Sequence, residues 1–193
     1  MNYKIQTEPN AEPITLDEAK LHLRVDISDD DTLIESYILV ARRVAEQISN
    51  HKWITQTWDI KLDSFPGTTF TLPKSLSPLV SVTHIKYTDE DDNESTFGSG
   101  NYVVDTYSDP ARIKLADGAA WPSDVLVELN GVEIRVIVGY GAPGDVPQEI
   151  KQAIFLMLGQ MYELRENVTV GEVAREIPMG VKSLLMLDRN VPV

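Results

Sequence analysis

The sequence contains no cysteine, so disulfide bonds, thiolate metal ligands and cysteine nucleophiles are all excluded. It has no run of the roughly 18 apolar residues that a membrane-spanning helix needs. The first ten residues, MNYKIQTEPN, lack the apolar segment of a signal peptide. These absences lead us to expect a soluble protein, made in a cytoplasm, that has no membrane partner.

Positive charge is also scarce, because 17 Lys and Arg residues stand against 30 Asp and Glu residues, for a formal net charge of −13. Residues 1–146 hold 12 basic and 24 acidic residues, whereas residues 147–193 hold 5 and 6. Such a balance argues against binding to a phosphate backbone. Acidity keeps a protein soluble and monomeric, and it would equally suit a surface past which nucleic acid slides without sticking. The composition leaves both interpretations open.

Residues 28–51 carry the strongest helix signal, because apolar side chains recur there every three or four positions on one broad stripe. Ser28 followed by Asp31 is a variant of the capping box and predicts the start of this helix. Other helices must cover so apolar a stripe. Its members are Leu33, Ile34, Tyr37, Ile38, Ala41, Val44, Ala45 and Ile48.

Three further segments are predicted to supply that cover. Thr15 and Glu18 form a capping box that starts a short helix ending near Arg24. Residues 147–165 have a second long apolar stripe, with Pro147 at the first helical position, and residues 178–189 form a last short helix. Residues 1–12 are polar and are expected to be extended or loosely attached. The short helix has an apolar face made of Leu16, Ala19, Leu21 and Leu23.

Between the helices the periodicity changes to alternation, with turn signals every eight to twelve residues, as in a small antiparallel sandwich or barrel. We therefore predict an α+β fold. A discontinuous helical bundle module, residues 13–51 plus 147–193, carries an inserted antiparallel β sandwich or barrel-like subdomain, residues 53–140. Strands are predicted over residues 55–62, 69–72, 79–87, 101–105, 112–115 and 131–138.

Local motifs for catalysis or cofactor binding are weak. Gly139, Gly141 and Gly144 match G-x-G-x-x-G, but Pro143 removes a backbone donor, so a flexible crossing between strand and helix is favoured over a nucleotide site. The acidic residues 89–93 lack the glycine and glutamate of a calcium loop, and they are expected to form a hairpin turn. We predict no catalytic residue, cofactor or metal, although a carboxylate pair assembled in space would leave no local signature. The three histidines, His22, His51 and His84, show no metal-ligand spacing.

An ordered set of short stretches resembles the head–tail connector (adaptor) proteins of long-tailed bacteriophages, in particular the longer versions with a β insert. The set covers nearly the whole chain. It includes residues 13–20, 22–26, 30–31, 33–34, 56–57, 62–63, 65–66, 72–73, 78–82, 85–87, 121–122, 139–141, 146–147, 150–154, 162–163, 165–166, 178–181, 184–185 and 189. Residues 186–188 depart from the pattern, because a turn containing proline is expected there.

This resemblance implies a non-enzymatic virion protein that is made in the host cytoplasm and forms a ring of about twelve copies when assembled. The ring would sit between the portal and the tail or a stopper protein. Its helices would line the ring, the β insert would face outward, and genomic DNA would pass through without sequence readout. The free protein could be a monomer or a ring. The C-terminal segment would contact the portal, with Met179, Val181, Leu184, Leu185, Leu187 and Arg189 as candidate binding residues.

Two alternatives remain open. The apolar C-terminal segment could simply close the helical bundle instead of docking on another protein. The chain could also be a carbohydrate-binding or hydrolytic β module braced by helices. Three tryptophans motivate that second function, because sugar sites use exposed aromatic platforms: Trp53, Trp58 and Trp121.

Overall fold

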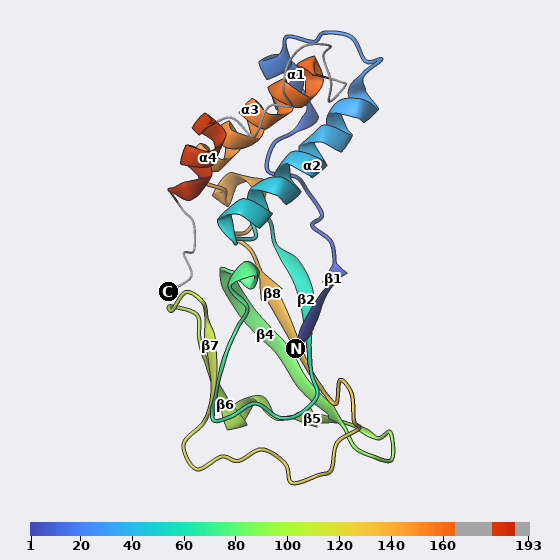
Figure 1. Ribbon diagram of the computed structural model, residues 1–193, viewed down its shortest axis with the longest axis vertical. Helices are drawn as coiled ribbons and strands as arrows, with labels where there is room; N and C mark the ends of the chain where they lie inside the picture. The colour runs from blue at the N-terminus through green and yellow to red at the C-terminus, as the bar shows by residue number, and fades with distance from the viewer. Residues whose placement is uncertain (165–178, 188–193) are drawn as a thin grey trace. The chain divides into compact units, whose positions relative to one another are not determined.

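The computed structural model describes residues 1–164 and 179–187, and these contain four α-helices and eight β-strands (Figure 1). The chain divides into two compact units. A β unit comprises Met1–Asn10 and Thr55–Tyr140, and a helical unit comprises Ala11–Ile54 and Gly141–Val193. The predicted α+β class is confirmed.

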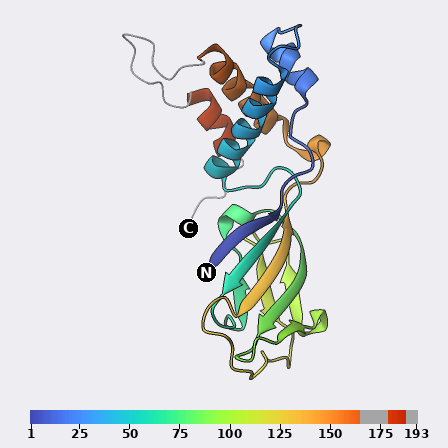
Figure 2. The ribbon, with the colours of Figure 1, turned by 90° about the vertical axis from the view of Figure 1, so that its right-hand side faces the viewer.

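The helical unit is built around α2, Asp31–Ser49, which contacts α1 (Leu16–Leu23), α3 (Gln148–Glu163) and α4 (Met179–Met186). Figures 1 and 2 both show α2 and α3 side by side, although about a hundred residues separate them in the chain. Burial of the facing apolar side chains holds the helices together. These include Ile34, Ile38, Ala41 and Ala45 of α2, Ile150, Ala153, Ile154 and Leu158 of α3, and Val181 and Leu185 of α4.

The other helices of the unit cover only part of the apolar stripe of α2. Its inner edge, which includes Ile34 and Ile38, is fully buried, whereas its outer edge is only half-buried. Val40, beside that outer edge, is 43% exposed. The half-buried members are Leu33, Tyr37, Val44 and Ile48.

The predicted N-cap of α2, Ser28, is wrong by two residues. Its N-cap is Asp30, which makes no side-chain capping bond, and Ser28 contributes only its carbonyl, at 3.1 Å from the amide nitrogen of Asp31. The carboxylates are used between helices instead. Asp31 pairs with Lys20 at 2.6 Å, and Asp30 accepts the Tyr162 hydroxyl at 2.6 Å. Partners from α1 and α3 have therefore displaced the local cap that the sequence pattern suggests.

The start of α1 follows the sequence pattern, so its predicted capping box is confirmed. The Thr15 hydroxyl accepts from the Glu18 amide at 3.2 Å, and the Glu18 carboxylate accepts from the Thr15 amide at 2.7 Å. The hydrogen bond from the Thr15 backbone holds the pKa of Glu18 below its usual value. The helix ends at Arg24, which adopts a left-handed conformation with φ of 58°.

The β unit consists of two antiparallel sheets. The larger has the strand order β1-β2-β8-β4-β5, and the smaller has the order β3-β7-β6. The strands of the larger sheet are β1 (Asn2–Thr7), β2 (Gln56–Leu62), β8 (Val132–Val138), β4 (Leu79–Thr88) and β5 (Glu94–Phe97). Those of the smaller sheet are β3 (Thr69–Thr71), β7 (Arg112–Leu115) and β6 (Tyr102–Asp105).

Central strand β8 shows why these residues form a sheet over an apolar core. Val132, Ile134, Val136 and Val138 are buried, while Glu133 and Arg135 alternate onto the other face. Ile134 pairs in register with Ile60 of β2 and Ile85 of β4, and all three are at most 1% exposed. Side chains from both sheets complete this core, among them Phe97, Tyr102 and Ile113.

Two strands were missed by the sequence patterns. Residues 2–7 form edge strand β1, paired with β2, although Ile5 is half-buried and the other five residues are exposed. Residues 94–97 form edge strand β5, which the sequence patterns did not predict. The predicted acidic turn over residues 89–93 is present between β4 and β5. Asp89 closes it by accepting from the Asn93 amide at 2.9 Å and the Asp91 amide at 3.0 Å.

Candidate functional site

The three histidines lie on separate elements and have different neighbours. His22 stacks on Phe155 with ring centroids 5.0 Å apart, and buried His51 lies 5.7 Å from the Trp53 ring. His84 Nε2 is 2.9 Å from a carboxylate oxygen of Glu133. Within residues 1–164 and 179–187, no group of three or more His, Asp or Glu side chains could hold a metal ion.

The tryptophans are packing residues. Trp53 is 0% exposed, and Trp58 is half-buried with its indole donating to Gln56 Oε1 at 3.0 Å. Trp121 stacks on Phe65 with centroids 5.2 Å apart and lies 4.6 Å from the Phe97 ring. Since a sugar platform needs exposed rings, the position of Trp53 removes one of the three residues that motivated a carbohydrate site.

In the G-x-G-x-x-G loop, a carboxylate of the loop itself binds one of the backbone amides. Gly139 and Gly141 have φ of 119° and 139°, which other residues rarely adopt. The Asp145 carboxylate accepts the Ala142 amide at 2.9 Å, and so uses a donor that a bound phosphate would need. The chain passes from the β unit to the helical unit at this loop.

Helix α4 carries most of the residues predicted to bind a partner, and the structure divides them between two faces. Val181 and Leu185, one turn apart, are 0% exposed and anchor the helix to its own unit. Leu184 is half-buried and Leu187 is 73% exposed, next to Met186 at 41%. Met179 is the first residue of α4, and Arg189 lies outside the described residues. The apolar side chains of this segment that reach solvent are therefore Leu184, Met186 and Leu187, and we call them the exposed surface of α4.

A second apolar surface, which sequence patterns did not reveal, lies where α1 leads into α2. Of the predicted apolar face of α1 only Ala19 is buried, whereas Leu21 is 82% exposed. Ile27, in the connecting loop, is 60% exposed. A depression of about 550 Å³ lies beside them. Its walls are Asp17, Lys20, Leu21, Arg24, Val25 and Asp26.

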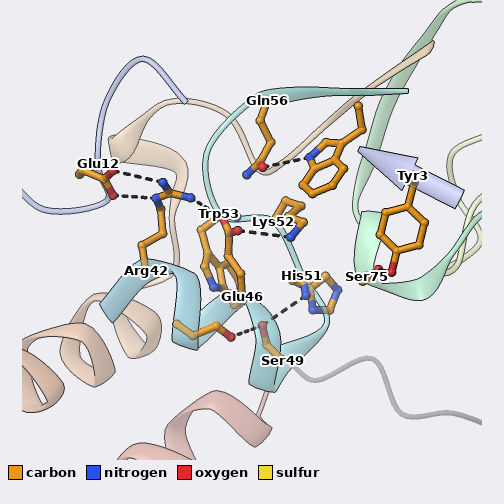
Figure 3. A network of polar contacts seen from close by, with 12 residues as sticks. Tyr3, Glu12, Arg42, Glu46, Ser49, His51, Lys52, Trp53, Gln56 and Ser75 are labelled. Carbon is orange, nitrogen blue, oxygen red and sulfur yellow. Dashed lines mark hydrogen bonds and ion pairs between the residues drawn. The ribbon is translucent and has the colours of Figure 1, made fainter. Parts of the chain in front are cut away.

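A buried ion cluster fixes the segments that flank the helices of this unit (Figure 3). Arg42, 2% exposed, donates through Nε to Glu12 at 2.7 Å and through Nη1 to Glu46 at 3.3 Å. Glu46 also accepts from Lys52 at 3.3 Å and from the Trp53 amide at 3.4 Å. Burial alone would lower the pKa of Arg42, but the two carboxylates raise it above its usual value.

In the β unit, charged side chains form ion pairs across the strands of the larger sheet. Glu133 pairs with Lys61 at 2.6 Å and His84 at 2.9 Å, and Arg135 donates to Asp59 at 2.6 and 2.7 Å. Burial alone would raise the pKa of Glu133, yet the hydrogen bonds from Lys61 and His84 outweigh it and lower that pKa to about 2. These pairs cross from β2 through β8 to β4.

The two units thus present exposed apolar side chains on helices and paired charges on a sheet face. The family model of the phage gp6-like head-tail connector proteins matches residues 13–115, more than half of the sequence, and the chain belongs to this family. The function implied by the resemblance, a structural head–tail connector of bacteriophage type, is confirmed. No curated protein matches the chain significantly.

Three solved structures are similar to the chain over 100% of its length and 97% of theirs. A chain in the virion of a native gene transfer agent (GTA) particle superposes with a TM-score of 0.82 at 24% identity, which shows the shared fold. A chain in the neck of an empty GTA particle, computed with C6 symmetry, gives 0.80 at 27%. One in the neck of a native GTA particle, computed with C12 symmetry, gives 0.78 at 26%. These relatives support a location in a virion neck.

Of the helices within the described part of the chain, none is long and apolar enough to cross a membrane.

Proposed function

We propose that this chain forms a ring in the neck of a phage-like particle, between the portal and the tail or a stopper protein, without catalysing a reaction. Membership of the connector family carries the proposal. The C6 and C12 symmetries of the similar neck structures support a closed ring of identical copies, which is the usual outcome of one repeated contact between subunits. The copies would be made in the host cytoplasm and added during assembly.

The exposed surface of α4 is the proposed portal-binding surface. Buried Val181 and Leu185 fix the helix, so Leu184 and Leu187 can be presented to a partner with little loss of conformational freedom. A helix that lays one apolar face into a groove is a common mode of protein recognition. Met179 and Arg189 remain predicted contributors at the two ends of the segment.

Net charge supports passive passage of genomic DNA through the ring. With a formal net charge of −13, each copy as a whole repels the phosphate backbone, so little affinity is expected from the release of condensed counterions. The proposal therefore expects no retention of duplex DNA by the purified protein at low salt.

Association of the purified full chain with purified portal rings tests the proposal. Leu187→Asp should weaken binding to the portal at least tenfold, because it places a charge at the centre of an apolar contact. The matched control is Val103→Asp in the β unit, where Val103 is 60% exposed. Equal binding by both variants, with unchanged circular dichroism, would contradict the assignment of α4.

A further inference from the structure

The surface between α1 and α2 exposes large apolar side chains that no other described part of the chain covers in a single copy. We name it the α1–α2 corner and define it as Leu21, Val25 and Ile27 with the charged residues of the adjoining depression. Leu21 is 82% exposed and Ile27 is 60% exposed. Helix α1, which carries Leu21, buries only Ala19 within its own unit. Large apolar side chains next to a depression of about 550 Å³ favour docking of another protein surface.

This corner is held in one conformation by contacts on each side. The Thr15–Glu18 capping box fixes the start of α1, and the Val25 amide donates to the Lys20 carbonyl at 3.0 Å to close its end. Lys20 binds Asp31 of α2 at 2.6 Å, with the two side chains only 17% and 32% exposed. An apolar surface that is already ordered loses little entropy on binding.

Charge indicates which partner the corner would accept. Its depression has two acidic side chains, Asp17 and Asp26, and two basic ones, Lys20 and Arg24, so its formal charge is zero. The chain as a whole carries −13, so two copies repel one another on average. In contrast, residues 88–94 and 116–131 of the β unit together hold eight Asp and Glu residues and no Lys or Arg. A contact between copies is least opposed where the local charge cancels.

We propose that the α1–α2 corner packs against the neighbouring copy of this chain in the ring. The inference rests on the proposed ring and names one of its subunit contacts. In a cyclic ring the contact is heterologous, so the corner meets a different surface of the next copy and does not need to match itself. The C12 symmetry of a similar neck places identical copies side by side, as this contact requires.

The test follows the filling of purified portal rings by the full chain with mass photometry. Leu21→Gln introduces another good helix former of similar size but replaces the apolar tip of the side chain with a polar amide. This variant should bind the portal as single copies, whereas filling of complete rings should need at least tenfold more protein. Val103→Gln, in the β unit, is the matched control and should fill rings like the unchanged chain.

Cross-linking identifies the occupant directly. A benzophenone amino acid at position 21 should form covalent chain–chain dimers on the portal, and the same probe at Tyr107, which is 99% exposed in the β unit, should not. Cross-links from position 21 to the portal instead of a second copy would overturn the inference while leaving the connector ring intact. Normal ring filling by Leu21→Gln would also overturn it. Failure of the unchanged chain to bind portal at all would refute the proposed function itself.

Discussion

The helical and β units treat charged side chains in opposite ways. The helical unit buries Arg42 at 2% exposure between Glu12 and Glu46, whereas the β unit keeps its ion pairs on a sheet face where Lys61 is 40% and Arg135 29% exposed. Removing ions from water is costly, so a buried cluster survives only when every charge keeps its partners. A pair whose cation still reaches water can lose that partner at less cost, because water replaces part of the interaction. The same residue types should therefore matter much more in one unit than in the other.

The largest effect is expected at Arg42. Arg42→Met would leave Glu46 buried without its guanidinium partner and should lower the free energy of unfolding of the helical unit by about 3–5 kcal/mol. Guanidinium denaturation followed by circular dichroism measures the change. Arg43→Met, at the exposed neighbouring position on α2, should change it by less than about 1 kcal/mol. Similar losses from both variants would show that the buried cluster is no more important than the surface.

The next largest effect on stability is expected at Gly131 in the β unit, where the backbone lies close to the preceding loop residues. A Cβ at Gly131 would lie 2.9 Å from Leu126 Cβ and 3.1 Å from the Val127 carbonyl oxygen. Gly131→Ala should therefore cost about 1–3 kcal/mol by overpacking. Trp121 in the same loop reports the loss by its fluorescence during denaturation. Gly67→Ala, with no atom within 4 Å of the new Cβ, is the matched control and should have almost no effect.

The smallest effect concerns Glu133 and depends on pH. Because its pKa is lowered to about 2 in the folded chain, its contribution is complete above its ordinary pKa of 4.5 and disappears as the pH falls through about 2. Glu133→Gln should cost about 1 kcal/mol or less near pH 7 and should flatten the stability profile between pH 4.5 and 2. Urea denaturation across that range measures both. An unchanged slope in the variant would mean that the pairs with Lys61 and His84 contribute nothing.

Sequence periodicity predicted the fold class and most elements, because long amphipathic segments are decided by local pattern. The alternation of β8 and the apolar stripe of α3 are clear examples. Edge strands β1 and β5 were missed because an edge strand buries few side chains and needs little apolar pattern. The cap of α2 was wrong because Asp30 and Asp31 are used by Tyr162 and Lys20, residues that no local rule could bring nearby.

The surfaces for partners were only partly predictable. The C-terminal segment stood out as apolar, but its division into buried Val181 and Leu185 and exposed Leu187 depends on how α4 packs. At Leu21 the pattern was misleading, because an apolar residue at helical spacing normally points inward. A possible signal was the short length of α1, since eight residues offer too little surface to bury three leucines.

Because residues 1–10 belong to the sheet, each unit interrupts the other along the chain. During synthesis β1 emerges first but must wait for β2 at residue 56, while α2 must wait for α3 at residue 148. Such long-range closure slows folding, and it ties completion of both units to the last third of translation. No single cut in the polypeptide separates the two units, and a chain that ends before residue 141 lacks the second half of the helical unit, including the α3 surface that covers α2.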